Sequence, residues 1–373
     1  MKMRFIVVPF ALFLVLVPHE ARATTEFARR TLLSCGACHS VVGTKLNDFG
    51  KAFKAKGYVV PQLVPKGDVP VTLQALSLYS SDPDPTGLPK FIVDKVILLT
   101  GGPIGPHVTF DGQQYVMDGG VPGDLREAWV EYTSSWTDKV PVDFRVGQQV
   151  FPLPVDPQRF KLSQQDYAIF VQTVGNNGFN LYEPMVGLRL SLGKEVSGLN
   201  LSALAFSNHD QGSPTPQTGT DWMFVARETF KHADFEVYRY TGRRAMSPGE
   251  DEFWRQGYGA NAYVGRFTLN TMLQVGNDTN PFGIGPPVVS SGGYVQGVYQ
   301  IGRNVFAYAR EDGVNDTAGN FGRDFVVGSS AFLGSAFKLQ IEDVLTNGAQ
   351  THNSLSLVFG IGLSTIHMGS SSY

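Results

Sequence analysis

The sequence predicts an all-β fold, a transmembrane antiparallel β-barrel of about 16 strands, preceded by a short N-terminal α-helical segment. Three observations lead to this prediction. From Val71 onward, stretches of about ten residues alternate apolar with small or polar side chains, which is the period of a strand. Short joins alternate with longer loops rich in Gly, Pro, Asn and Asp, as in outer-membrane barrels. The outward-facing sets are largely Leu, Val, Phe and Tyr, whereas a soluble sheet exposes charged side chains there.

The predicted strands differ in clarity. In the clearest, Asn353–Thr365, the odd-numbered positions from Leu355 to Leu363 are apolar and the even-numbered ones are mostly small or polar. A soluble β-sandwich or propeller is the alternative fold. The other predicted strands are Val71–Ser81, Phe91–Thr100, Leu125–Trp136, Val142–Phe151, Tyr167–Val174, Pro184–Leu192, Leu199–Ser207, Trp222–Phe230, Phe235–Arg243, Gln256–Val264, Phe267–Gly276, Gly293–Ile301, Val305–Arg310, Asp324–Leu333 and Phe337–Leu345.

Charged residues inside the predicted strands indicate a polar, hydrated lumen. A position in turns or at the rim is the alternative for each of them. The inward positions are held by Arg145, Arg189, Arg227, Glu236 and Arg310. Aromatic residues near strand ends predict girdles at the two membrane interfaces. These aromatic residues are Trp129, Trp136, Tyr182, Trp222, Tyr238 and Tyr240.

The two cysteines of the chain lie in the motif Cys35-Gly36-Ala37-Cys38-His39. It reads C-x-x-C-H, the attachment pattern of a c-type haem. Two thiols about one short turn apart can each bond a vinyl group, and the next imidazole ligates the iron. A disulfide in so tight a loop would be strained, a zinc site needs further ligands, and a redox dithiol needs a βαβ context. The motif therefore predicts one covalent haem c on Cys35 and Cys38, with His39 as an axial iron ligand.

The sixth iron ligand is open, because neither Met nor a second His follows His39 within the haem segment. The candidates are His107 and Met117, both expected in the loop region between the second and third strands. An ordinary loop residue is the alternative for each. A five-coordinate iron would permit small-ligand binding or peroxidase-like chemistry.

Four parts follow one another along the chain. Residues 1–23 have the charged start, the apolar run Phe5–Val17 and the small-residue cleavage site of a secretory signal, with a retained anchor as the alternative. Residues 24–60 form the haem-binding segment, in which Phe27–Leu33 and Leu46–Tyr58 are the predicted helices. Residues 61–70 form a linker, and residues 71–373 form the barrel.

Composition agrees with an exported β protein. The chain holds 42 Gly and 26 Phe but only 17% charged residues, which suits β-structure at a lipid surface. Its formal net charge of -3 offers no basis for nucleic-acid binding.

With the haem motif, the run Leu46-Asn47-Asp48-Phe49-Gly50 and the barrel pattern, the chain resembles the fused outer-membrane monohaem cytochrome c–porins. The best-known members are the iron oxidases of iron-oxidising bacteria. The resemblance spans the mature chain. It implies a location in the outer membrane of a Gram-negative bacterium, with outer-membrane lipid around the barrel. It also implies an extracellular electron donor such as Fe(II), and a periplasmic c-type cytochrome or another redox protein as partner.

Two functions follow as hypotheses. The first is an electron carrier, with extracellular Fe(II) oxidation as the associated reaction, in which the haem inside a barrel passes electrons between an outside donor and periplasmic cytochromes. The second is a porin-type diffusion channel whose haem segment acts as a plug or sensor. For the channel, the proline-rich stretch Phe151–Pro157 either folds inward as a constriction or forms an external loop. An enzyme acting on a small sulfur or nitrogen compound lacks a placed catalytic set.

Overall fold

A computed structural model gives the fold. It describes residues 39–41, 45–46, 49–50, 53, 71–83, 89–104, 107–137, 140–153, 163, 165–178, 181, 185–193, 198–208, 217–302, 305–333, 337–346 and 350–362. The predicted signal, the predicted helix Phe27–Leu33, Cys35, Cys38 and the 61–70 linker lie outside these residues.

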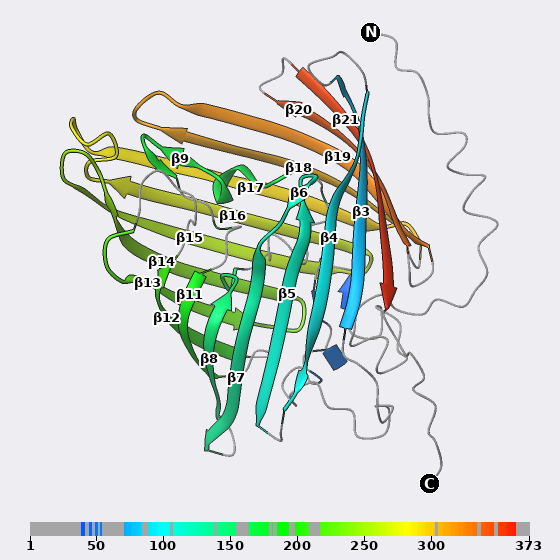
Figure 1. Cartoon of the computed structure of the whole chain (residues 1–373), viewed down its shortest axis with the longest axis horizontal. Helices are drawn as coiled ribbons and strands as arrows, with labels where there is room; N and C mark the ends of the chain where they lie inside the picture. The colour runs from blue at the N-terminus through cyan, green and yellow to red at the C-terminus, as the bar shows by residue number, and fades with distance from the viewer. Residues whose placement is uncertain are drawn as a thin grey trace.

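The described part of the chain forms one closed antiparallel barrel of sixteen long strands (Figure 1). The two-residue β6 (Val121–Pro122) adds a short pairing to β5. The long strands are β3 (Val71–Pro83), β4 (Pro89–Pro103), β5 (Val108–Asp118), β7 (Leu125–Thr137), β8 (Val140–Gln149), β11 (Met185–Gly193), β12 (Gly198–Asn208), β13 (Asp221–Thr229), β14 (Ala233–Ala245), β15 (Glu250–Val264), β16 (Phe267–Asp278), β17 (Val288–Gln300), β18 (Val305–Asp316), β19 (Phe321–Leu333), β20 (Phe337–Thr346) and β21 (Gln350–Gly362).

Neighbours in the barrel are neighbours in sequence, as the colour order in Figure 1 shows. Two pairings complete the ring. In the first, β21 pairs with β3, with Phe359 opposite Ala75. In the second, β8 pairs with β11 across the long connection 150–184, with Arg145 opposite Arg189. Closure leaves every long strand paired on both sides, so no sheet edge is left open.

The predicted fold class is confirmed, with one predicted strand wrong and one strand missed. Tyr167–Val174 is not a barrel strand: it holds the 3₁₀ turn η1 (Ala168–Phe170) and the short β9 (Thr173–Val174), which pairs with β10 (Asn177–Gly178). Tyr167, Ile169, Phe170 and Val174 are buried inside the barrel instead of facing lipid. The strand that was missed is β5, in which Gly112, Gln113 and Gln114 interrupt the apolar alternation. The two errors cancel in the strand count.

Alternation along each strand separates two faces. On β13, Met223 and Val225 are buried, whereas Trp222 and Phe224 are 47% and 54% exposed. The same contrast recurs around the ring, so the outer surface is an apolar belt and the inner surface carries nearly all the buried polar side chains.

The two ends of the barrel differ in their connections. One end, here called the short-turn end, carries 104–107, 138–139, 194–197, 230–232, 265–266, 301–304 and 334–336. The other, here called the long-loop end, carries the connections 150–184, 209–220 and 279–287 among others. Outer-membrane barrels place short turns on the periplasmic side and longer loops outside.

Two apolar clusters fill part of the interior. The larger joins residues of the 150–184 connection to inward side chains of β11 to β17, and it includes Phe206, Tyr240 and Tyr294. The smaller joins Val298 and Phe306 with neighbours on β18 to β20. Gly257 makes room for the larger cluster, because a Cβ there would lie 2.0 Å from the Tyr238 ring of the neighbouring strand.

Little of the N-terminal segment is described. The short strands β1 (His39–Val41) and β2 (Lys45–Leu46) pair with each other, so Leu46 lies in a strand and not in the predicted helix. Phe49 and Phe53 are helical, and their rings stack with centroids 6.4 Å apart, as expected for positions four apart on a helix. Among the described residues, no helix is long and apolar enough to cross a membrane.

Candidate functional site

The candidate site is the lumen together with the chain that enters it. We call residues 150–184, which connect β8 to β11, the lumen segment; 150–153, 163, 165–178 and 181 of it are described. β8 ends at Gln149, and Pro152, three residues later, has no N–H to donate to a ladder, so the chain leaves the sheet. Phe151 and Leu153 then turn into the larger apolar cluster, and the Phe151 ring lies 5.3 Å from that of Phe206. The inward alternative for this proline-rich stretch is confirmed as far as Leu153, and 154–157 lie outside the described residues.

The middle of the lumen segment is an aromatic wedge. Tyr167, Ile169 and Phe170 are all fully buried. The Tyr167 ring lies 4.5 Å from that of Tyr294 on β17, and its hydroxyl donates to Gln296 Oε1 at 2.9 Å. Burial raises the pKa of Tyr167, so at neutral pH its hydroxyl stays protonated and keeps this donor role. The wedge is therefore held to one wall by both packing and a buried hydrogen bond.

Arg310 on β18 fixes the chain just before the wedge. Its guanidinium is fully buried and lies 4.1 Å from the centroid of the Tyr167 ring. It donates to Ser163 Oγ, and its Nη2 donates to the carbonyl oxygens of Gln165 and Asp166, both at 3.0 Å. Its Nε lies 2.8 Å from a carboxylate oxygen of Asp312, which balances the charge. A planar guanidinium with several donors suits this simultaneous contact with side chain and backbone.

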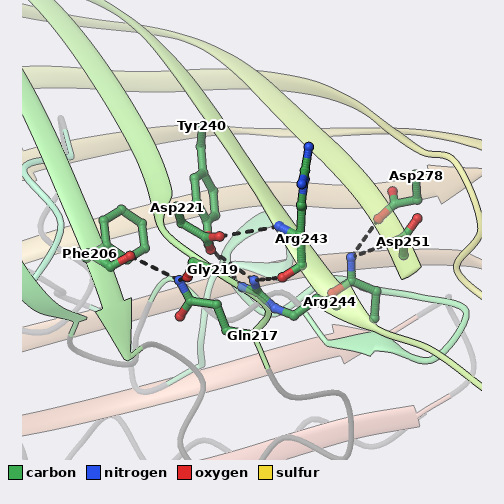
Figure 2. Close-up of polar contacts among 10 residues, drawn as sticks. Phe206, Gln217, Gly219, Asp221, Tyr240, Arg243, Arg244, Asp251 and Asp278 are labelled. Atoms are coloured by element: carbon green, nitrogen blue, oxygen red, sulfur yellow. Dashed lines mark hydrogen bonds and ion pairs between the residues drawn. The ribbon is translucent and has the colours of Figure 1, made fainter. Parts of the chain in front are cut away.

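Asn177 fixes the far end of the lumen segment. Its Nδ2 donates to Asp251 Oδ2 at 2.9 Å and to Asp278 Oδ1 at 2.8 Å, so one amide bridges β15 and β16. In Figure 2, dashed lines that mark these two hydrogen bonds end on the labelled residues Asp251 and Asp278. Arg255 forms an ion pair with Asp278 at 2.8 Å, and both side chains are fully buried. Removing the amide would leave a buried carboxylate pair with fewer donors.

The turn before Asn177 is shaped for this position. Gly175 has a φ of +60°, and a Cβ there would lie 2.7 Å from the carbonyl oxygen of Pro281. The next residue, Asn176, donates its backbone N–H to the same Pro281 oxygen at 2.8 Å. Only glycine tolerates both the conformation and the close approach. The lumen segment is thus also attached to the 279–287 loop at the long-loop end.

A second buried charge cluster lies nearby on β13 and β14. Arg244 Nη1 donates to Asp221 Oδ2 at 2.9 Å, and the Tyr240 hydroxyl donates to the same oxygen at 2.7 Å (Figure 2). Both charged side chains are fully buried. The Tyr240 ring also packs 5.9 Å from Phe151, so this cluster supports the start of the lumen segment.

The wall formed by β7, β8 and β11 carries a charge cluster of a different kind. Glu131 Oε2 accepts from Arg145 Nε at 2.8 Å and from Arg189 Nη2 at 2.9 Å. Arg145 lies 3.6 Å from the centroid of the Trp129 ring. One carboxylate between two guanidinium groups leaves this triad with a formal charge of +1.

The inward placement predicted for the five charged residues is confirmed in the barrel. Arg145, Arg189, Glu236 and Arg310 are buried, and Arg227 is half-buried in an ion pair with Glu236. Arg227 also donates to the Pro152 carbonyl oxygen at 3.1 Å, which adds a contact to the lumen segment. These side chains are paired with protein groups, so the wall around the lumen segment is densely packed.

The predicted aromatic girdle was partly wrong. Trp129, Tyr238 and Tyr240 are 3%, 1% and 0% exposed, because all three face inward. Tyr238 and Tyr240 belong to the larger apolar cluster, and the Trp129 ring packs against the Arg145 guanidinium. Trp222 does lie on the outer face near a strand end. Tyr182 and the side chain of Trp136 lie outside the described residues.

The haem motif is described only in part. Cys35 and Cys38 lie outside the described residues, and His39 is described by its backbone, which pairs with Leu46. Their role in holding haem stays a prediction. Within the described residues, no group of three or more His, Cys, Asp and Glu side chains is arranged to hold a metal ion directly.

The two candidates for the sixth ligand lie at opposite ends of the barrel. His107 is in the exposed turn before β5, where its Nδ1 lies 3.1 Å from the Thr133 carbonyl oxygen. Met117 lies on β5 and not in a loop as predicted. Ten residues of strand separate them by about 30 Å, so a haem placed at one end reaches at most one of the two.

The comparisons with known proteins agree with this geometry at the level of the fold. No protein-family model and no curated protein matches the sequence. Among solved structures, the chain is similar to the anion-selective porin from Comamonas acidovorans, with a TM-score of 0.61, 11% identity, and coverage of 79% of this chain and 100% of that one. It is also similar to OmpF of Salmonella typhi in complex with daunomycin (TM-score 0.58, 10% identity, 78% and 96% covered) and to the outer membrane channel DcaP of Acinetobacter baumannii (0.57, 10%, 78% and 96%). The fold is therefore that of a porin-type β-barrel.

Proposed function

We propose that this protein is an outer-membrane β-barrel that acts as a narrow diffusion channel, with the lumen segment as its constriction. The observation that carries the proposal is the segment itself. It enters the barrel from the long-loop end and is fixed there by Arg310, by the Tyr167 wedge and by Asn177. The apolar outer belt supports a position in lipid, and the porin-type neighbours support the outer membrane in particular.

The constriction predicts size selectivity. The barrel ring could enclose an aqueous channel, since barrels of about sixteen strands commonly do. Here packed apolar side chains of the lumen segment cover the inward face of β11 to β17, which narrows the cross-section left for a solute.

A proteoliposome assay tests this proposal. The purified full-length protein is reconstituted, and the influx of small and large neutral solutes is measured by swelling. We expect influx of small sugars with a sharp fall for larger ones. Liposomes that stay impermeable to every solute, although the protein is folded as judged by its heat-modifiable gel migration, would contradict the channel.

A second candidate function rests on a separate observation, the motif Cys35-Gly36-Ala37-Cys38-His39. We propose outer-membrane electron transfer as this candidate, between an extracellular donor such as Fe(II) and a periplasmic cytochrome. Two thiols followed by an imidazole fit covalent haem c, which would supply one-electron chemistry. Cys35 and Cys38 would hold the group and His39 would ligate its iron.

Measurements on one preparation of the protein distinguish the two candidate functions. A c-type haem spectrum that survives denaturation, and is lost in a Cys35→Ser/Cys38→Ser variant, would support electron transfer. Rapid reduction of that haem by Fe(II) would identify the donor. Absence of covalent haem in protein made by a host competent in cytochrome c maturation would remove this candidate and leave the channel untouched.

A further inference from the structure

A small acidic cavity lies between the lumen segment and the long-loop end of β18 and β19. Its volume is about 220 Å³. Three aspartates line it, each from a different part of the chain: Asp166 from the lumen segment, Asp316 from the end of β18 and Asp324 from β19. Among the described residues that line it, none is Lys or Arg. The described lining of the cavity therefore carries three carboxylates and no cationic side chain.

Two of these aspartates are held rigidly. Asp316 Oδ1 accepts from the backbone N–H groups of Ala318 and Asn320, at 2.9 and 3.0 Å, and its Oδ2 accepts from Asn320 Nδ2 at 2.8 Å. Asp324 Oδ2 accepts from Gln165 Nε2 at 3.0 Å. Both are more than nine-tenths buried, and within the described part of the chain neither forms an ion pair with Lys or Arg. Buried carboxylates without a cationic partner are costly, so a bound cation would stabilise them.

A second observation independently points to a ligand. Gln172 also lines the cavity, and its side chain is 6% exposed. Its Oε1 is buried and accepts no hydrogen bond from the described residues. A buried amide oxygen without a donor needs a partner, and water bound to a cation would be such a donor.

We infer that this cavity binds one hydrated divalent cation. The carboxylates are not gathered tightly enough to ligate a metal ion directly, so the ion keeps its water and is held through it. Six waters take up about 180 Å³ in the liquid, which the cavity accommodates. The waters donate to the carboxylates and to Gln172 Oε1. The inference depends on the proposed function in one respect only, namely which side of the membrane the cavity faces.

Binding of Mn(II) to the detergent-solubilised full-length protein tests the inference, because free Mn(II) has an EPR signal that is lost on binding. We expect one saturable site per chain. Asp324→Asn keeps the acceptor for Gln165 but removes a charge, and should weaken binding about tenfold. Gln172→Glu adds a charge and should tighten it by a similar factor. Glu311→Gln is the matched control, since Glu311 is exposed on β18 and pairs with Arg323 outside the cavity; it should change affinity by less than about twofold.

Heat-modifiable gel migration confirms that each variant is folded. No saturable Mn(II) site in the wild-type protein would overturn the inference. So would an affinity that is the same in wild type, Asp324→Asn and Gln172→Glu. If Asp324→Asn does not fold, Gln172→Glu alone decides. The readout involves neither solute influx nor haem, so this site and the proposed function fail separately.

Discussion

The inner and outer faces of the same strands contact different surroundings, and their side chains differ accordingly. On β18, Arg310 and Asp312 face inward and are buried as a pair, whereas Glu311 between them faces outward and is 53% exposed at its side chain. On β11, inward Arg189 is 6% exposed and its neighbour Leu188 is 45% exposed to the outside. A shift of one residue along the strand exchanges a buried side chain for one that contacts lipid or solvent.

This contrast teaches where the barrel can carry function. Where it contacts lipid, the outer face needs only to be apolar, and many side chains satisfy that requirement. The inner face depends on particular partners from distant parts of the sequence, above all those that hold the lumen segment. Substitutions should therefore act through lost partners on the inside and through solvation on the outside.

The largest effect should come from Arg310→Met. The substitution removes the donors to Ser163, Gln165 and Asp166 and leaves Asp312 buried without its ion pair. We expect a loss of about 3–5 kcal/mol in the free energy of unfolding, measured by urea titration in lipid. Arg310→Lys keeps the charge but not the fork of donors, and should lose less. An unchanged free energy of unfolding in Arg310→Lys would contradict a role for the hydrogen bonds from Arg310 to the lumen segment.

On the outer face, Leu188→Arg should be the most costly change. Leu188 lies near the middle of β11, so the new charge would face the hydrocarbon of the bilayer. The expected loss is about 2–4 kcal/mol, measured in the same way. Leu199→Arg is the control, because Leu199 is close to the short-turn end and a charge there should cost about 0–1 kcal/mol. Similar costs at both depths would argue against a lipid-facing outer surface.

Asn177→Ala should have a smaller effect that is confined to the lumen segment. It removes the amide between Asp251 and Asp278, with an expected loss of about 1–3 kcal/mol. Faster proteolytic cleavage within 163–178 would show that the segment is loosened. Asn261→Ala removes an inward amide acceptor of Asn270 between β15 and β16 and serves as the control. If both variants were cleaved equally, Asn177 would not be a specific anchor.

The smallest effect should come from Glu311→Gln. It breaks the ion pair with Arg323, in which both side chains are more than half exposed. The expected loss is about 0–1 kcal/mol, falling further at high salt. A loss as large as that of Arg310→Met would remove the distinction between the two faces.

Much of the fold could be predicted from the sequence, because period-two alternation is a local property. β5 was missed since Gly112, Gln113 and Gln114 face or flank a polar lumen and dilute the alternation. Tyr167–Val174 was mistaken for a strand because an apolar run has the same sequence pattern whether its side chains face lipid or a packed lumen. Periodicity gives the presence of an apolar face but not the identity of what covers it.

The candidate site was harder to predict. Tyr238 and Tyr240 were placed at the interface, although both share the strand parity of Glu236, which was correctly placed inside. That parity was a usable signal. Asn177 gave none, because its partners Asp251 and Asp278 lie 74 and 101 residues away in sequence. Contacts of this kind are made by closure of the barrel and not by any local pattern.

The central claim is that the lumen segment narrows a membrane-spanning barrel. Single-channel conductance in a planar bilayer tests it most directly, comparing the full-length protein with a variant in which residues 163–178 are replaced by a short Gly-Ser linker. The account predicts a small conductance that rises several-fold, in steps of uniform size, when the segment is replaced. An unchanged conductance in a folded variant would contradict it, because the segment would then not define the path through the barrel.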